Sequence, residues 1–405
     1  MAYVFTLSAK IANPGLGSAP GLACYDRLTA ALAPEVDLNT GAVPARHHRR
    51  PGDRANQRIT EHETSSTGGM PIRTGVMTRL TAVVVTSKEK VVRAVTVSYY
   101  GASPVVRDLP TPAAGPGQIR IKLAAAGVNP MEASLASGEW RPAPATFPMV
   151  LGVDGAGTVD SLGEGVTRFS LGERIFGQLL LAPIGSTGTY AEYVAVTAEA
   201  PLAAVPKGLD LIEAAAVPTV GGTGLTLVES LEPLEDKTVL VVGAGGGVGS
   251  FATQFAVIAG ALVIANVRAP DEERVRSYGV AETVDHNTVP LAEAVRRAHP
   301  DGIDVLIDLA SDAESFASLA LLVRPGGAAV STRYVADTRA LAASGVRGVN
   351  FVLRQTSEVL ERVADDLTDR RIVPPPVTRI ALDEVPAAMG PRSHRRHDVK
   401  TVIVL

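Results

Sequence analysis

The chain of 405 residues contains a single cysteine, Cys24, so an internal disulfide is excluded. No uninterrupted apolar run reaches the ~18 residues of a membrane-spanning helix, which gives no reason to expect a membrane partner. Basic residues are not in excess either: 38 Lys and Arg face 42 Asp and Glu, so nucleic acid is not an expected partner. The first residues lack the basic segment of a secretory signal. Together these absences predict a cytoplasmic protein.

The composition is that of a globular protein, with 46% hydrophobic and 20% charged residues. A chain of this length is expected to form two domains. Residues 1–91 differ from the rest, because turn-forming and charged residues occur there without a helical or strand period. We predict a poorly structured N-terminal extension over 1–91, with the natural start of the protein near Met77 or Val92.

A glycine-rich turn stands between an apolar strand-like run and a helix-length segment. Thr238–Val242 is followed by Gly-Ala-Gly-Gly-Gly-Val-Gly, and a second apolar run begins at Ala261. Glycines let the backbone turn sharply and approach a pyrophosphate, while the helix N-terminus offers unpaired N–H groups to it. The β-α-β pattern therefore predicts a dinucleotide site, with Ala244, Gly246 and Gly249 at the three motif positions. An ordinary strand-to-helix turn is the alternative.

The segments around this motif show a clear pattern of secondary structure. Short alternating strands separated by glycine-rich turns predict a β-rich domain over residues 92–211. Over 212–348, strands and helices alternate in the way that builds a parallel sheet with helices on both faces. Residues 349–405 are expected to return to the first domain through a last strand. The helices expected from spacing include Leu225–Leu231, after a glycine-rich segment, and Phe351–Arg371.

Several short motifs follow one another in a fixed order along residues 93–405. They are Ala125-Ala-Gly-Val-Asn-Pro, Phe147-Pro-Met-Val-Leu-Gly-Val-Asp-Gly-Ala-Gly, Gly172-Glu-Arg-Ile-Phe-Gly, Gly188-Thr-Tyr-Ala-Glu-Tyr, Glu213-Ala-Ala-Ala-Val-Pro, the glycine turn and Lys400-Thr-Val-Ile-Val-Leu. This series resembles the medium-chain dehydrogenase/reductase superfamily, and within it the zinc-independent quinone oxidoreductase-like branch. The resemblance implies an α/β fold, in which a GroES-like β-rich catalytic domain accompanies a Rossmann cofactor domain with a doubly wound parallel sheet. Relatives commonly form homodimers.

Zinc-dependent members of this superfamily hold the metal with cysteine and histidine. This chain has no cysteine after Cys24, and Gly152-Val153-Asp154 stands where zinc members carry Gly-His-Glu. No metal is therefore expected. Without a Lewis acid to hold an alkoxide, alcohol oxidation becomes difficult, whereas hydride addition to an electrophilic carbon–carbon double bond or a quinone stays feasible.

The end of the second strand of the β-α-β unit distinguishes the two nicotinamide cofactors. An acid there binds the ribose 2′-hydroxyl of NADH, whereas a basic residue accommodates the 2′-phosphate of NADPH. The segment ends on Arg268, with no carboxylate before Asp271, so NADPH is the predicted cofactor. Arg274, in the following helix, is expected to assist. The alternative for Arg268 is a solvated loop residue.

The resemblance assigns further residues to the site. Asn129 and Thr223 match positions beside the nicotinamide and are the expected catalytic residues; for Asn129, an Asx-type turn before Pro130 is the alternative. Glu132 lies near an acidic position of the family, but the aromatic residue that follows in relatives is missing. The cofactor-binding residues expected from the motif and the resemblance are Ala244, Gly246, Gly247, Val248, Gly249, Arg268, Arg274, Ala310, Ser311, Asn350, Phe351 and Lys400. The basic loop 391–398 is either a solvated turn or a further phosphate contact.

The protein predicted from these features is a zinc-independent reductase that transfers hydride from NADPH to a small-molecule quinone or α,β-unsaturated carbonyl compound. The proton comes from water or from a donor that the sequence does not identify; Tyr190 and Tyr193 are expected to pack in the core instead. One alternative is an enoyl reductase that acts in trans on an acyl chain in polyketide or lipid synthesis. Another, of a different class, is an NADPH-binding sensor with little turnover.

Overall fold

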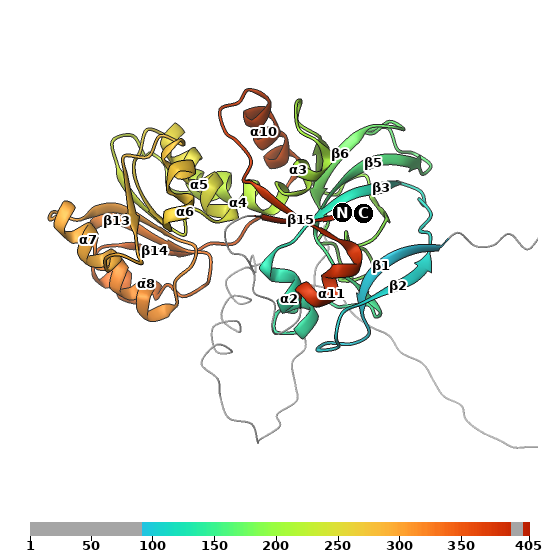
Figure 1. Ribbon diagram of the computed structural model, residues 1–405, viewed down its shortest axis with the longest axis horizontal. Helices are drawn as coiled ribbons and strands as arrows, with labels where there is room; N and C mark the ends of the chain where they lie inside the picture. Colours follow the sequence, from blue (N-terminus) through green and yellow to red (C-terminus); the bar gives the residue numbers. More distant parts are fainter. Residues whose placement is uncertain (1–90, 390–399) are drawn as a thin grey trace, which may run out of the picture. The chain divides into compact units, whose positions relative to one another are not determined.

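The computed structural model describes residues 91–389 and 400–405 (Figure 1). The predicted extension over 1–91 lies outside the described residues except for Val91, which begins the first strand. The basic loop 391–398 also lies outside them. Within the described residues, no helix is long and apolar enough to cross a membrane.

The β-rich domain contains two sheets. The larger has the order β15-β16-β3-β5-β6-β8, with β7 also paired to β3. Its strands are β3 (Gln118–Gly127), β5 (Asp154–Leu162), β6 (Arg174–Gln178), β7 (Tyr193–Thr197), β8 (Leu202–Ala204), β15 (Val377–Ala381) and β16 (Lys400–Val404). The smaller has the order β2-β1-β4, from β1 (Val91–Val97), β2 (Val105–Pro110) and β4 (Met149–Val150). Because β16 pairs antiparallel with β3, the end of the chain lies in the domain in which the described part begins.

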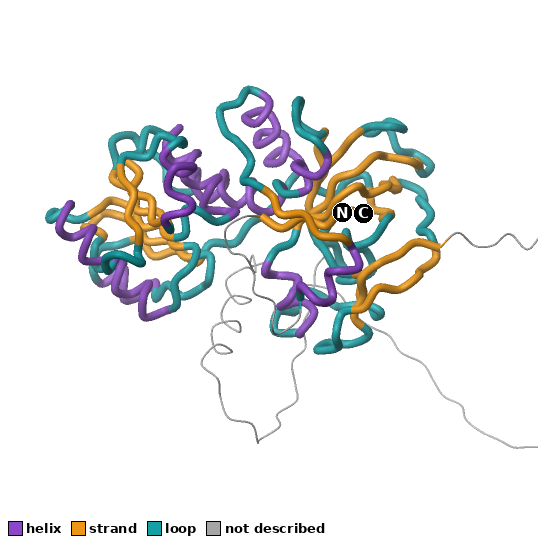
Figure 2. The backbone as a smooth tube through the Cα atoms, viewed as in Figure 1, coloured by secondary structure: helices purple, strands orange, loops and turns teal. Residues whose placement is uncertain are grey.

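The second domain is a six-stranded parallel sheet with the order β11-β10-β9-β12-β13-β14 (Figure 2). The strands are β9 (Thr238–Val242), β10 (Leu262–Val267), β11 (Glu282–Asp285), β12 (Ile303–Asp308), β13 (Val323–Ser331) and β14 (Arg347–Asn350). The helices between them are α5 (Gly247–Ile258), α6 (Ala269–Arg276), α7 (Leu291–Ala298), α8 (Ala313–Ala320) and α9 (Thr338–Ala343). The strand order reverses between β9 and β12, which is where doubly wound sheets bind ligands.

Burial on both faces explains why the central strand β9 is almost entirely apolar. In β9, Val239 and Val241 belong to one hydrophobic cluster, whereas Leu240 and Val242 belong to another. Successive side chains of a strand point to opposite faces, so each face packs against its own layer. The alternation expected of a half-buried strand is therefore absent here.

The helix α4 (Pro218–Glu229) differs from its prediction. It begins at Pro218 rather than at Leu225 and runs through the glycine-rich segment. Glycine lowers helix propensity, but α4 packs so closely on α5 that a Cβ at Gly224 would lie 2.6 Å from Phe251 Cβ. Tertiary packing thus determines the start of this helix and requires glycine within it.

The helix predicted from Phe351 also begins elsewhere. Residues 351–356 are irregular, and α10 (Ser357–Thr368) starts after Thr356, whose hydroxyl accepts a hydrogen bond from Val359 N at 3.2 Å. The prediction missed this N-cap because the apolar spacing continues upstream of it. The remaining helical elements are α2 (Pro130–Ser137), α3 (Leu211–Ala215), the short 3-10 helix η2 (Leu382–Glu384) and α11 (Val385–Ala388).

Candidate functional site

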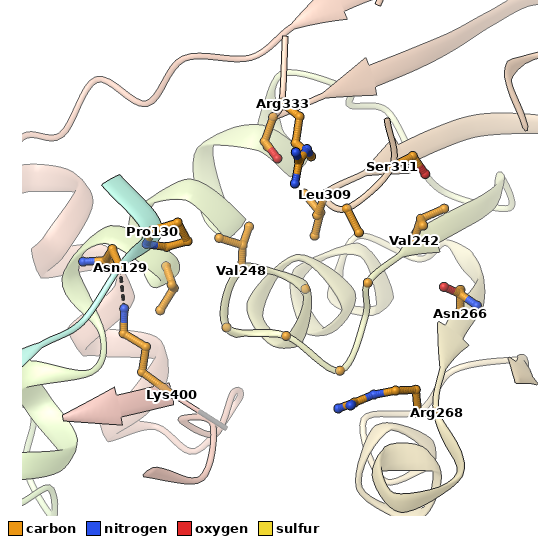
Figure 3. A pocket seen from close by; sticks show the side chains of 18 of the residues that line it. Asn129, Pro130, Val242, Val248, Asn266, Arg268, Leu309, Ser311, Arg333 and Lys400 are labelled. Atoms are coloured by element: carbon orange, nitrogen blue, oxygen red, sulfur yellow. Dashed lines mark hydrogen bonds between the residues drawn. The ribbon is translucent and has the colours of Figure 1, made fainter. Parts of the chain in front are cut away.

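A cavity of about 1460 Å³ runs along the glycine-rich turn between β9 and α5 (Figure 3). Its wall comes from strand ends of the parallel sheet and, in the β-rich domain, from the start of α2 and from β16. Pockets for small molecules commonly measure about 300–1,000 Å³, so this cavity has room for a dinucleotide and a second molecule. The residues assigned from the sequence that line it are Asn129, Gly246, Gly247, Val248, Gly249, Arg268, Ala310, Ser311 and Lys400.

The glycine turn has a backbone geometry that only glycine allows. Gly243 has a φ of +82°, and a Cβ at Gly249 would lie 2.0 Å from the Gly243 carbonyl oxygen. The first N–H groups of any α-helix have no intrahelical acceptor. Because Gly246 caps α5 without a side-chain hydrogen bond, no capping side chain occupies these N–H groups. Such a helix end binds anions, and the turn therefore fits a pyrophosphate. Ala244 is fully buried, and its N–H donates to the Asn266 carbonyl at 3.1 Å.

One end of the cavity is formed by Arg268, directly after β10. Its Nη2 donates to Asp271 Oδ2 at 3.1 Å. Asp271, which sequence analysis did not assign, lines the same end and also pairs with Arg274. Since two guanidinium groups surround one carboxylate, these three residues together carry a net positive charge.

Arg274 does not line the cavity. Its guanidinium donates to the Gly245 carbonyl at 2.9 Å, to Ser250 Oγ at 3.0 Å and to the Tyr278 hydroxyl at 3.0 Å. The bond to Gly245 stabilises the glycine turn from the side that does not face the cavity. The structure therefore gives Arg274 a supporting place rather than one within the cavity.

The ends of β12 and β13 supply another part of the wall. Asp308 Oδ1 accepts hydrogen bonds from the N–H groups of Ala310 and Ser311 at 3.0 and 2.8 Å, which fixes the loop after β12. Arg333, just after β13, also lines the cavity, as does Leu309 after β12 (Figure 3). Sequence analysis did not assign Arg333, although its position after a strand end at this edge was a usable signal.

Besides Ala244 and Arg274, three more assigned residues lie away from the cavity wall. Asn350 exchanges hydrogen bonds with the N–H and carbonyl of Ala336, each at 3.0 Å, and so holds the loop that follows β13. Phe351 packs against the main hydrophobic cluster. Thr223 lies inside α4, and its buried hydroxyl donates to the Thr219 carbonyl at 2.6 Å.

Asn129 and Lys400 meet at the other end of the cavity (Figure 3). Asn129 precedes α2, and its Oδ1 accepts a hydrogen bond from Lys400 Nζ. Its Nδ2 donates to Asp154 Oδ2 at 2.9 Å, and its main-chain N–H donates to Glu132 Oε2 at 2.7 Å. The side chains of Asn129, Glu132, Asp154 and Lys400 are all buried. Asn129, expected from the sequence to be a catalytic residue, is thus the centre of a buried polar network.

Asp154 is the most strongly bonded member of this network. Thr219 donates to it twice, from its hydroxyl at 2.6 Å and from its N–H at 3.2 Å, and Lys400 Nζ lies 3.8 Å from Oδ2. Gln178 Nε2 in turn donates to the Thr219 hydroxyl at 2.8 Å. From the sequence, Asp154 was noted only because Gly152-Val153-Asp154 stands where zinc-dependent members carry Gly-His-Glu. No motif or spacing in the sequence pointed to Thr219 or Gln178 as part of the site.

Burial alters the ionisation of all three charged groups. Loss of solvation raises the pKa of Glu132 to about 7, although Lys400 opposes the rise. Burial also raises the pKa of Asp154, against the effects of Lys400 and of the hydrogen bonds from Thr219 and Asn129. The pKa of the Lys400 ammonium is lowered by the same loss of solvation.

Comparison with known proteins agrees with this architecture. A sequence profile of the alcohol dehydrogenase GroES-like domain matches residues 115–207, and one of the zinc-binding dehydrogenases matches residues 247–344. Human quinone oxidoreductase is 30% identical over 244 residues, which are 59% of this chain and 72% of the human protein. The chain belongs to the quinone oxidoreductase-like branch of the medium-chain dehydrogenase/reductase superfamily. Membership in this superfamily implies a nicotinamide cofactor, and the predicted fold class is confirmed.

Two other relatives are matched over smaller shares of their length, and a solved structure is matched over its whole length. Quinone oxidoreductase of Pseudomonas aeruginosa is 36% identical over 200 residues, 48% of this chain and 59% of that protein. The phthioceranic/hydroxyphthioceranic acid synthase of Mycobacterium tuberculosis is 34% identical over 216 residues, 52% of this chain and 10% of the synthase. A solved quinone oxidoreductase of Coxiella burnetii shares the fold, with a TM-score of 0.66 at 21% identity, over 78% of this chain and all of that one.

The second profile is named for zinc binding, but a match to it does not show that this chain binds zinc. In the part of the chain that the structure describes, no three His, Cys, Asp or Glu side chains are grouped to hold a metal ion. Cys24 lies outside that part. Zinc independence thus stays a prediction from the amino-acid sequence.

Proposed function

We propose that the protein is an NADPH-dependent, zinc-independent reductase of quinones or α,β-unsaturated carbonyl compounds. The observation that carries the proposal is one continuous cavity, which joins the glycine turn to the Asn129–Lys400 pair. Gly246, Gly247, Val248 and Gly249 would hold the pyrophosphate. When bound, a reduced nicotinamide supplies a hydride. The protein orients the two reactants.

The charge around Arg268 supports NADPH over NADH. The 2′-phosphate of NADPH carries negative charge that a guanidinium can neutralise with charge-assisted hydrogen bonds. Arg268 lies at the end of β10, the position at which the two cofactors are distinguished. Asp271 is the carboxylate beside it, but that carboxylate is already paired with two arginines. It would therefore repel a phosphate less than a free acid would.

The relatives' names and the chemistry of the cavity support the substrate class. Several relatives are quinone oxidoreductases. Reduction of a quinone or an enone places negative charge on a carbonyl oxygen, which nearby cations and hydrogen-bond donors stabilise. Lys400 and Arg333 both line the cavity and provide positive charge.

A second candidate is an enoyl reductase that acts on an acyl chain. Its support is the similarity to the mycobacterial synthase, which is named for phthioceranic and hydroxyphthioceranic acid. This activity uses the same hydride chemistry and differs in the substrate, an acyl thioester with a double bond next to the carbonyl. A neutral enone and an acyl thioester of equal length would separate the two candidates.

The proposal is tested with the full chain and two cofactors. Binding of NADPH and NADH is followed by fluorescence and melting temperature, and NADPH oxidation is then measured against quinones, simple enones and unsaturated acyl thioesters. We expect tighter binding of NADPH and turnover with a quinone or an enone. Turnover only with the thioesters would favour the enoyl reductase. Binding without any turnover would favour an NADPH sensor, and failure to bind either cofactor would overturn all three.

A further inference from the structure

The reduction proposed above adds one hydride and one proton to the substrate, and the source of the proton is an open question. A tyrosine is a common donor, but Tyr190 is fully buried in the hydrophobic cluster of the β-rich domain. The ionisable groups of the cavity wall near Asn129 are different, because they are buried and yet reach the cavity. The inference below rests on the proposed reductase function.

Three ionisable side chains come together around Asn129. Glu132 is exposed by 1%, Asp154 by 0% and Lys400 by 6%. They come from α2, β5 and β16, and their other polar neighbours, Asn129 and Thr219, are uncharged. The cluster thus has two carboxyl groups and one ammonium group. A buried excess charge is unfavourable, so the neutral form of the cluster holds one proton on one of the two carboxyl groups.

The hydrogen bonds indicate which carboxyl group holds this proton. Asp154 accepts three hydrogen bonds shorter than 3.3 Å, two from Thr219 and one from Asn129, and it lies 3.8 Å from the Lys400 ammonium. Each of these contacts favours the ionised form. Glu132 accepts one short bond, from Asn129 N at 2.7 Å, and a weaker one from its own main-chain N–H, while Oε1 has a long contact of 3.4 Å with Asn129 Nδ2. Glu132 Oε1 therefore has room for a proton.

Glu132 also has the better access to a substrate. Glu132, Asn129 and Lys400 line the cavity, whereas Asp154 lies behind Asn129 and is not part of the wall. A pKa of about 7 suits a group that gives up a proton near neutral pH and regains it. Asp154, with its paired ammonium, would hold the Asn129 amide in place.

We propose that Glu132 donates the proton that completes the reduction, directly or through one water molecule. The O–H bond of the Glu132 carboxyl group breaks and its electron pair stays on the carboxylate. The proton forms a C–H bond at the α-carbon of an enone, or an O–H bond on a quinone, while the other new bond takes the hydride from the reduced nicotinamide. After product leaves, the carboxylate regains a proton from water in the open cavity.

The test compares two glutamates that have the same role at a helix start. Glu132→Gln keeps an oxygen that accepts from Asn129 N but cannot carry the exchangeable proton. Glu213→Gln is the matched control, because Glu213 accepts from Asp210 N at 3.1 Å at the start of α3, away from the cavity. Melting temperature and NADPH affinity establish that both variants are folded and bind the cofactor.

The first measurement needs no cofactor. Infrared difference spectra of the protein between about pH 6 and about pH 8 should show loss of a protonated carboxylic acid as the pH rises. This band should be absent from Glu132→Gln and present in Glu213→Gln. If the band persists unchanged in Glu132→Gln, the proton belongs to another group and the proposal is overturned.

The second measurement is the pH profile of kcat with the best quinone or enone. In the wild type and in Glu213→Gln, kcat should fall as pH rises through about 7, whereas Glu132→Gln should lose about 10²-fold in kcat and this pH dependence. A residue that only positions Asn129 would lower kcat without removing the pH dependence, and that result would overturn the proposal. Failure of the wild type itself to oxidise NADPH would instead count against the proposed function.

Discussion

Lys400, in the last strand, donates a hydrogen bond to Asn129 Oδ1, although 271 residues separate the two in the sequence. Both residues are buried, and both line the cavity that begins at the glycine turn. The aliphatic part of Lys400 also passes close to the turn, since a Cβ at Gly247 would lie 3.8 Å from Lys400 Cδ. The last strand of the β-rich domain thereby connects the expected cofactor region with Asn129.

Removal of the Lys400 ammonium should destabilise the fold. Lys400→Met leaves two buried carboxyl groups without a cation, and breaking a buried ion pair in this way costs about 3–5 kcal/mol. The loss should be smaller at acidic pH, where the carboxyl groups are protonated. Urea unfolding at neutral and at acidic pH measures the loss in the free energy of unfolding under each condition. Lys237→Met is the control, because Lys237 is itself exposed and its partner Asp304, 3.7 Å away, keeps a second cation in Arg324, so this change should cost less than about 1 kcal/mol. Equal losses in the two variants would contradict the importance of the buried cluster.

Arg268→Ala should reduce the preference for NADPH over NADH. Hydrogen bonds to charged groups contribute about 1.5–3 kcal/mol, so NADPH affinity should fall by at least about tenfold while NADH affinity stays nearly constant. Fluorescence titration with each cofactor measures the change. Arg276→Ala is the control on the same helix, because Arg276 pairs with Glu272 and does not line the cavity. A parallel loss of affinity for both cofactors would show that Arg268 does not read the 2′-phosphate.

Gly249→Ala and Gly246→Ala should affect different properties. A Cβ at Gly249 would lie 2.0 Å from the Gly243 carbonyl oxygen, which is backbone and cannot move aside. Gly249→Ala should therefore lower the melting temperature sharply. At Gly246 the nearest atom would be 3.3 Å away, so the alanine variant should fold but bind a dinucleotide less tightly because its methyl group enters the phosphate region. The turn has been misinterpreted if Gly249→Ala melts like the wild type.

Stability should fall as pH rises through neutrality. The pKa of Glu132 is raised from its ordinary value of 4.5 to about 7, so the folded state binds more protons than the unfolded state between these values. Its contribution is fully present below about pH 4.5 and is lost as pH approaches about 7, by about 3 kcal/mol. Asp154, whose pKa burial also raises, acts in the same direction.

Glu132→Gln isolates the part of this pH dependence that belongs to Glu132. Urea unfolding at about pH 5 and about pH 7.5 should show a smaller difference in the free energy of unfolding for Glu132→Gln than for the wild type. Glu213→Gln should behave like the wild type. Identical pH dependence in all three proteins would mean that Glu132 does not titrate in this range.

Local sequence patterns were sufficient for the parts of the site that one segment builds. The glycine turn, the strand before it and the helix after it are contiguous, so the steric demands of a tight turn leave a readable pattern at Gly246–Gly249. Arg268, Ala310 and Ser311 were assigned for the same reason, since they lie just after parallel strands, and all three line the cavity. The start of α4 was predicted wrongly, because close packing of α4 on α5 overrides the low helix propensity of glycine.

The sequence by itself determined the α/β class, the glycine turn and the motifs that identify the superfamily, because each of these depends on residues close together in the chain. Only the tertiary structure decided that Asn129, Glu132, Asp154 and Lys400 form one buried network, since they come from three elements that pairing of β16 with β3 and β3 with β5 brings together. It also decided that Arg274, Asn350 and Thr223 support the fold around the cavity rather than line it. The loss of solvation of these side chains and the pairing of distant strands arise only in the packed molecule, so no local sequence pattern predicts them.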